Sequence, residues 1–339
     1  MSKLIYAIIL VIGVGILNAG DNTKETSESS KIVWPSAPDE ARIEYRYSIE
    51  KSSDIGIEKG FFSKVYDFLF GEEDAVLSAP FGVYADKSRI YTTDIASKSV
   101  YVFDKEENEV ITILGSDEEK FLYPIDVVAD KEGKIYVSDS VRVKIYVFDA
   151  DGDFQYTIVP KKLQRCVGIT IGENNNLYIV DALADQIHVT SLKGEYLYSI
   201  GEIGKAEGEF NKPTFIAADN GNIYVSDSMN HRVQILSEKG EFILSFGQLG
   251  QNIGDFGSPR GIALDKEGNI YVTDTMFNNI QIFNQQGELL LVVGHYGARK
   301  GEFALPEDIA ILEDGSIYIS DTNNRRIQVL KKLEIKEGV

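Results

Sequence analysis

The sequence predicts an all-β fold made of six copies of one four-stranded antiparallel unit, and three observations support this. The pattern I/L-Y-x-x-D occurs six times, with successive aspartates 42 to 47 residues apart. A proline or a cysteine stands 14 or 15 residues before each aspartate, and a β-branched residue follows six residues after it. Short apolar runs separated by glycine-containing turns fill each copy. The six aspartates are Asp94, Asp139, Asp181, Asp227, Asp274 and Asp321.

The four strands of a copy are clearest in the fifth, where we expect them at residues 261–265, 270–274, 280–283 and 288–293. These runs carry apolar side chains on both faces, so each sheet has to be covered on both sides by its neighbours. A period of this length with four strands per copy is typical of a β-propeller. We therefore expect a propeller domain over residues 39–339, with six blades that start near residues 80, 124, 166, 213, 259 and 306.

The sixth copy lacks a fourth strand, and the start of the chain supplies a candidate. Residues 44–49 match residues 195–200, the fourth strand of the third copy. We expect residues 42–49 to form the outer strand of the last blade and to close the ring non-covalently, which protects the sheet edges. Residues Gly60–Phe70 show helical spacing of apolar residues and predict a short inserted helix. That helix would pack on the propeller rim or dock a partner or a membrane surface.

The N-terminus has the form of an export signal. Lys3 precedes an apolar run, Leu4–Leu17, so residues 1–19 are expected to be a signal peptide or, if uncleaved, a membrane anchor. Residues 20–38 are polar at their start and are interpreted as a flexible tether. The body of the protein is therefore expected to be exported, periplasmic or extracellular, either free or anchored to the membrane.

Composition limits the chemistry. The 339 residues carry a net charge of −19, which disfavours a nucleic-acid partner and favours a basic one. Cys166 is the only cysteine, so intramolecular disulfides and CxxC zinc sites are excluded. The three histidines share no metal-ligand spacing, and the chain has no GxSxG motif. The sequence therefore predicts no catalytic residue, no metal ligand and no cofactor.

In a propeller, the loops before strand one and between strands two and three emerge on one face, called here the loop face. Positions that are equivalent by the repeat carry different residues there, as expected for a surface that recognises a partner. Around the channel mouth we expect Phe81, Asp126, Arg165, Thr214, Arg260, Glu307 and Asp308. Farther out we expect Arg142, Met229, Asn230, Met276, Phe277, Asn324 and Arg325.

The run D-S-M-N-H-R-V-Q-I that begins at Asp227 resembles the NHL repeat, and weaker copies begin at Asp274 and Asp321. The resemblance covers about residues 80–330, and its last three copies are the most specific. Together with the export signal, it makes the chain similar to bacterial exported NHL propellers, whose interaction functions are mostly undefined. A shared fold does not decide function.

The sequence is therefore consistent with two functional hypotheses. The leading hypothesis is an exported, non-catalytic scaffold that binds a protein or peptide through its loop face. The alternative, implied by similar propellers, is a metal-dependent lyase or lactonase-like hydrolase. In that case Asp126, Glu307 and Asp308 would hold a hard cation at the channel mouth.

Overall fold

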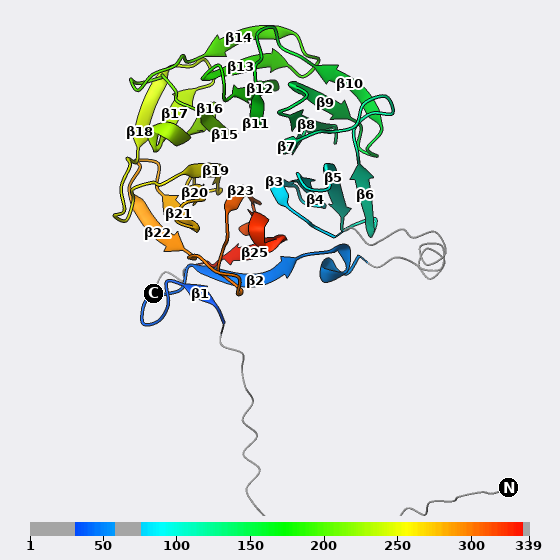
Figure 1. Cartoon of the computed structure of the whole chain (residues 1–339). Helices are drawn as coiled ribbons and strands as arrows, with labels where there is room; N and C mark the ends of the chain where they lie inside the picture. The colour runs from blue at the N-terminus through cyan, green and yellow to red at the C-terminus, as the bar shows by residue number, and fades with distance from the viewer. Residues whose placement is uncertain (1–30, 58–75, 335–339) are drawn as a thin grey trace, which may run out of the picture. The chain divides into compact units, whose positions relative to one another are not determined.

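A computed structural model describes residues 31–57 and 76–334, which form six antiparallel sheets around a common axis (Figure 1). Each sheet is one blade, with its first strand innermost, so the predicted six-bladed propeller is confirmed. The predicted signal or anchor at residues 1–19 and the predicted helix at Gly60–Phe70 lie outside the described residues. Within the described residues, no helix has the length and apolar character needed to span a membrane.

The first three blades each consist of four consecutive strands. Blade one contains β3 (Pro80–Ala85), β4 (Arg89–Asp94), β5 (Ser99–Asp104) and β6 (Glu109–Ile113). Blade two contains β7 (Pro124–Ala129), β8 (Ile135–Asp139), β9 (Lys144–Phe148) and β10 (Phe154–Ile158). Blade three contains β11 (Cys166–Ile171), β12 (Asn176–Asp181), β13 (Gln186–Ser191) and β14 (Tyr196–Ile200).

The last three blades follow the same order, but the sixth takes strands from both ends of the chain. Blade four contains β15 (Pro213–Asp219), β16 (Asn222–Asp227), β17 (Arg232–Ser237) and β18 (Phe242–Phe246). Blade five contains β19 (Pro259–Leu264), β20 (Ile270–Asp274), β21 (Asn279–Phe283) and β22 (Leu289–Val293). Blade six contains β23 (Pro306–Ile311), β24 (Ser316–Asp321), β25 (Arg326–Lys332), β2 (Ile43–Ile49) and β1 (Val33–Trp34). The described residues also include three short 3-10 helices, η1 (Ser52–Ile55), η2 (Ser228–Asn230) and η3 (Thr322–Asn324).

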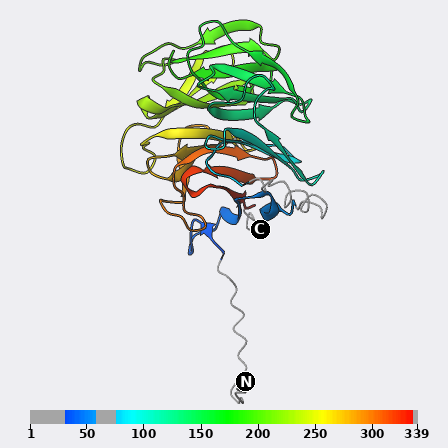
Figure 2. The same cartoon turned by 45° about the vertical axis from the view of Figure 1, so that its right-hand side comes forward.

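The N-terminal strand β2 closes the ring, as the sequence predicts. It pairs antiparallel with β25 in a register that sets Ile49 opposite Ile327. Figure 2 shows this blue strand beside the red strands of the last blade. Strand β1 pairs with β2 and adds a fifth strand, so the end of the segment expected to be a tether belongs to the sheet.

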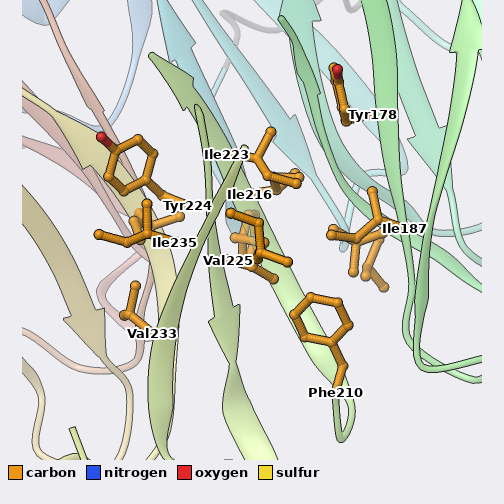
Figure 3. Packing of buried hydrophobic residues seen from close by; sticks show 14 of the residues in the cluster. Tyr178, Ile187, Phe210, Ile216, Ile223, Tyr224, Val225, Val233 and Ile235 are labelled. Carbon is orange, nitrogen blue, oxygen red and sulfur yellow. The ribbon is translucent and has the colours of Figure 1, made fainter. Parts of the chain in front are cut away.

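The hydrophobic core lies between neighbouring blades. Tyr178 and Ile187 of blade three belong to one cluster with Ile216 and Val225 of blade four, and Phe210 from the loop between the blades joins them (Figure 3). Burial of a side chain of this size contributes about 1.5–3 kcal/mol relative to exposure. Packing through both faces of each sheet therefore holds the ring together, which explains the apolar character of both strand faces.

Hydroxyl groups that precede the repeated aspartates link four of the six blades to the next one. Thr93 Oγ1 donates to the carbonyl of Ile125 at 2.8 Å, across the boundary between blades one and two. The equivalent bonds run from Ser138 to Val167, from Thr273 to Glu307 and from Ser320 to Phe81. These bonds fix the inner strands relative to each other, and the inner strands surround the channel.

Candidate functional site

The repeated aspartates organise the loop face. Asp227 Oδ1 accepts a hydrogen bond from the amide of Asn211 at 2.7 Å, which ties the preceding loop to strand β16. Asp227 Oδ2 accepts from Arg232 Nε at 2.8 Å and from Asn230 Nδ2 at 2.9 Å. In blade six, Asp321 accepts in the same way from Arg326 and Asn324. The repeated carboxylates are therefore structural, as their recurrence in every copy suggests.

Three connecting loops of the loop face share one length and one construction. They cover residues 201–212, 247–258 and 294–305. In each loop a phenylalanine that is 0% exposed anchors the chain, and the residue seven positions earlier forms a β-bridge with it. The bridged pairs are Ile203–Phe210, Leu249–Phe256 and Tyr296–Phe303. The first residue of each pair is 71%, 67% and 74% exposed, respectively, so an apolar side chain is held in solvent at three equivalent places.

Hydrogen bonds from neighbouring strands hold all three loops: Gln281 Nε2 donates to the carbonyl of Asp255 in the second loop, and the first and third loops are each held by an arginine and a glutamine. The Arg232 guanidinium donates to three carbonyl oxygens of the first loop at 2.8 to 2.9 Å. Gln234 Nε2 donates to the carbonyl of Glu209 in the same loop. Arg326 and Gln328 hold the third loop in the same manner. The arginine and glutamine of the repeat motif thus serve to fix the loop that carries the exposed apolar residue.

Exposed apolar side chains are concentrated on the loop face. Within the described part of the chain, nineteen large apolar side chains are exposed; thirteen of them lie in loop-face loops and none lies in the turns of the opposite face. The thirteen are Val76, Leu114, Leu122, Val141, Val159, Leu183, Ile203, Met229, Leu249, Ile253, Met276, Tyr296 and Leu305. Met229 and Met276 were expected on this face from the sequence, whereas the three loops were not. Their signal is a pattern, G-x-I/L/Y-G-x-x-x-G-D/E-F, that occurs three times.

The predicted loop-face residues fall into three groups by burial. The exposed ones are Arg165, Met229, Met276 and Arg325. The half-buried ones are Arg142, Asn230, Arg260, Phe277 and Asn324, and the buried ones are Phe81, Asp126, Thr214, Glu307 and Asp308. The amide groups of Asn230 and Asn324 donate to loop carbonyls, of Gly204 and Gly297 respectively, so both residues support the loops.

Aromatic rings close the central channel on the loop-face side. Phe81 of blade one stacks on Phe215 of blade four, the opposite blade in the ring, with ring centroids 6.2 Å apart. Beside them Arg260 Nε lies 3.8 Å from Glu307 Oε2, and neither atom has a hydrogen-bond partner among the described residues. Burial raises the pKa of Glu307, and the charge of Arg260 partly offsets that rise. The channel mouth therefore combines an apolar stack with a buried polar pair that makes no hydrogen bond through these two atoms among the described residues.

The residues two positions after the start of each inner strand alternate in size around the channel. In blade order they are Gly82, Asp126, Gly168, Phe215, Gly261 and Asp308. A Cβ added to Gly168 would lie 2.5 Å from the carbonyl oxygen of Thr214, so the backbones of neighbouring inner strands approach too closely for a side chain. The glycines thus make room for the larger residues beside them.

The two aspartates of this ring reach the inner strand of the next blade. Asp126 Oδ2 accepts from the amide of Ile169, and Asp308 Oδ2 accepts from the amide of Val83, both at 2.8 Å. Burial raises the pKa of Asp126 to about 7. Burial and, next in size, the charge of Asp126 raise the pKa of Asp308 well above its usual range. The two carboxyl groups therefore interact electrostatically, and neither ionises easily.

Asp126 and Asp308 belong to a cavity of about 210 Å³ that all six inner strands line. The lining extends along these strands away from Phe81 and Glu307, toward the face opposite the loop face. The residues expected together at the channel mouth are thus divided by the structure: Glu307 lies beside Arg260, whereas the two aspartates line the cavity. Among residues 31–57 and 76–334, no three His, Cys, Asp or Glu side chains are grouped closely enough to hold a metal ion.

Comparison with solved structures finds the same fold in proteins of different kinds. A protein of unknown function from Bacteroides thetaiotaomicron is 16% identical, with a TM-score of 0.64 over 86% of this chain and 75% of that one. Virginiamycin B lyase from Staphylococcus aureus is 14% identical, with a TM-score of 0.56 over 76% and 96%. An auxiliary nutrient binding protein from B. thetaiotaomicron is 16% identical, with a TM-score of 0.59 over 76% and 70%. No match was found among curated protein sequences.

The fold and the loop-face construction define a six-bladed β-propeller in which repeated aspartates order the turns of the loop face. A family model for the NHL repeat matches residues 210–236, 256–283 and 303–330, the three copies that the sequence singled out. The chain is therefore a six-bladed β-propeller that contains NHL repeats in its last three blades.

Proposed function

We propose that this protein is an exported, non-catalytic scaffold that binds a protein or peptide partner through its loop face. The supporting observation is the one-sided distribution of exposed apolar side chains, which gather on the loop-face loops. Large apolar groups exposed together are typical of interaction surfaces, and side chains on preorganised loops lose little conformational freedom on binding.

The three equivalent loops supply the anchors of this surface. Ile203, Leu249 and Tyr296 project from loops that buried phenylalanines hold in place, and Met229 and Met276 lie in neighbouring turns. Methionine and tyrosine are enriched where proteins contact partners, since one adapts its shape and the other combines an apolar ring with a polar tip. We expect these five residues to contribute most of the binding energy.

The net negative charge of the protein would steer a basic partner toward this apolar surface. Acidic residues crowd the turns of the opposite face, for example at residues 130–132, 149–153 and 313–314, whereas the loop face mixes both signs. The overall charge of −19 would attract a basic partner from a distance, and the apolar anchors would then form the contact.

Crosslinking in intact cells, followed by mass spectrometry of the captured proteins, tests the proposal. The double variant Ile203→Ser/Leu249→Ser should lose the captured partner. The matched control, Ile243→Ser/Leu290→Ser, changes two exposed apolar residues on outer strands and should retain it. If both double variants capture the same proteins as the unaltered chain, the loop face is not the binding surface.

A further inference from the structure

Blades three and six have outer strands of nearly the same sequence, which is EYLYSI at residues 195–200 and EYRYSI at residues 44–49. Figure 1 shows both strands, β14 and β2, at the periphery of the ring. Each strand sets a serine opposite the third strand of its blade in the same register, Ser199 in blade three and Ser48 in blade six. The tyrosine three residues earlier places its hydroxyl 2.9 Å and 3.0 Å from the serine oxygen, respectively. The two blades thus carry the same Tyr–Ser pair.

The residue opposite the serine differs between the two blades. In blade six it is Gln328, whose amide donates to the repeated aspartate of its blade and to the carbonyl of Glu302, so it holds the preceding loop. In blade three it is His188, whose Nδ1 lies 2.8 Å from Ser199 Oγ and whose Nε2 lies 3.2 Å from Asp181 Oδ2. The position that holds a loop in blade six therefore connects a serine to a carboxylate in blade three.

The donors and acceptors order these groups into one chain of hydrogen bonds. Burial alone would raise the pKa of Asp181, but hydrogen bonds from His188 and from backbone amides outweigh it and lower the pKa to about 2. The carboxylate is thus an acceptor, so in the neutral ring Nε2 carries the hydrogen and Nδ1 accepts from the Ser199 hydroxyl. The serine hydrogen is then engaged, so the Tyr196 hydroxyl donates to Ser199 Oγ. A hydroxyl, a base and a third group that orients the base form the arrangement that activates a nucleophile.

We propose that Ser199 is a nucleophile that accepts an acyl group from an activated ester, which makes it a covalent modification site on the rim of blade three. Ser199 Oγ bonds to the carbonyl carbon of the ester, and its proton passes to His188 Nδ1. The bond from that carbon to the leaving oxygen breaks, and the leaving group departs with the electron pair and takes the proton from His188. The Tyr196 hydroxyl, beside Oγ, can donate to the carbonyl oxygen as negative charge develops there. The products are an acyl-serine and a free phenol or alcohol.

The exposure of the site allows acylation but disfavours hydrolysis of the product. Ser199 is half-buried, and Tyr196 and Leu197 beside it are 45% and 40% exposed, so a small ester can reach the hydroxyl. His188 is 1% exposed, so an acyl group on Oγ stands between its Nδ1 and the solvent. Water then has little access to the base that would activate it. The acyl group should therefore remain, and the site adds a covalent acceptor to the proposed scaffold without depending on its partner.

A fluorophosphonate probe, which phosphonylates activated serines, tests the proposal on the full-length protein. Peptide mapping by mass spectrometry gives the labelling rate at Ser199 and at Ser48, the matched control in the same molecule. We expect Ser199 to react at least tenfold faster, since a positioned base contributes about 10²–10⁴-fold to such a step. p-Nitrophenyl acetate should give a single burst of nitrophenol and an acetylated peptide that contains Ser199.

His188→Gln gives blade three the residue that blade six carries, so it should fold, as urea denaturation would show, and should lower labelling of Ser199 to the rate at Ser48. If it does not fold, Gln328→His provides the test, because it sets an imidazole opposite Ser48 and should raise labelling there by tenfold or more. Equal labelling of Ser199 and Ser48 in the unaltered protein would overturn the proposal. So would full labelling of Ser199 in folded His188→Gln, an unchanged rate at Ser48 in Gln328→His, or continuous release of nitrophenol without a burst.

Discussion

Replacement of Ile49 tests the non-covalent closure of the ring. Ile49 is 0% exposed, ends strand β2 and packs in the cluster between blades six and one with Val83 and Ile327. Ile49→Ala should lower the free energy of unfolding by about 3 kcal/mol, within the usual 2–5 kcal/mol for isoleucine to alanine in a core. Urea denaturation measures this as a lower midpoint with an unchanged slope.

The matched control for Ile49 is Ile200, which has the same position at the end of β14 and is 5% exposed. Ile200→Ala removes the same atoms from a blade whose strands are continuous in the chain. If β2 is an integral strand, the two variants should differ by less than about 1 kcal/mol. A cost below about 0.5 kcal/mol for Ile49→Ala, beside a full cost for Ile200→Ala, would refute closure by β2.

Three further predictions concern the channel and the loops. The free energy of unfolding should fall as the pH rises from about 4 to about 7. A carboxyl group whose pKa is raised in the folded state, such as that of Asp126, stabilises the fold only while it is protonated. In urea denaturations over this pH range, Asp126→Asn should make the free energy of unfolding less dependent on pH. Gly168→Ala should lower the free energy of unfolding by about 2 kcal/mol or more, since its Cβ would meet the carbonyl oxygen of Thr214 at 2.5 Å. A nearly unchanged urea midpoint would show that the strands do not approach so closely there. Arg232→Lys should speed hydrogen exchange in residues 201–210 by tenfold or more, because the single ammonium nitrogen of lysine cannot reach the separate carbonyl groups that Nη1 and Nη2 of the guanidinium reach. Unchanged exchange would show that the arginine does not hold the loop.

The fold was predictable because every blade repeats the same signals. The spacing of the aspartates gave the number of blades, and the match of residues 44–49 to residues 195–200 identified the closing strand. Strand β1 was not predictable, since two residues carry no periodicity and Val33–Trp34 pair only because β2 already stands at the edge of the last blade. A sequence pattern predicts a strand only when the strand is long enough to show alternating or repeated residue types.

The candidate site was predictable only in outline. The sequence placed Asp126 and Asp308 in loops around the channel mouth, whereas the structure places them inside the inner strands β7 and β23, where they line a cavity beyond the mouth. Their position depends on how closely neighbouring inner strands approach, which glycines such as Gly168 and Gly261 permit. That approach is a property of the assembled ring. The pairing of Arg260 with Glu307 has the same origin, because the two residues come from different blades.

The two halves of the ring present different loop faces, and this asymmetry predicts which half the proposed partner would contact. The loops that lead into blades four, five and six have twelve residues each and carry the bridged apolar residue. The loops that lead into blades two and three cover residues 114–123 and 159–165, differ in length and lack that construction. Rigid, equivalent anchors therefore lie along one half of the ring. A partner that uses them should lose affinity on Tyr296→Ser but tolerate Val159→Ser, although both side chains are exposed on the same face.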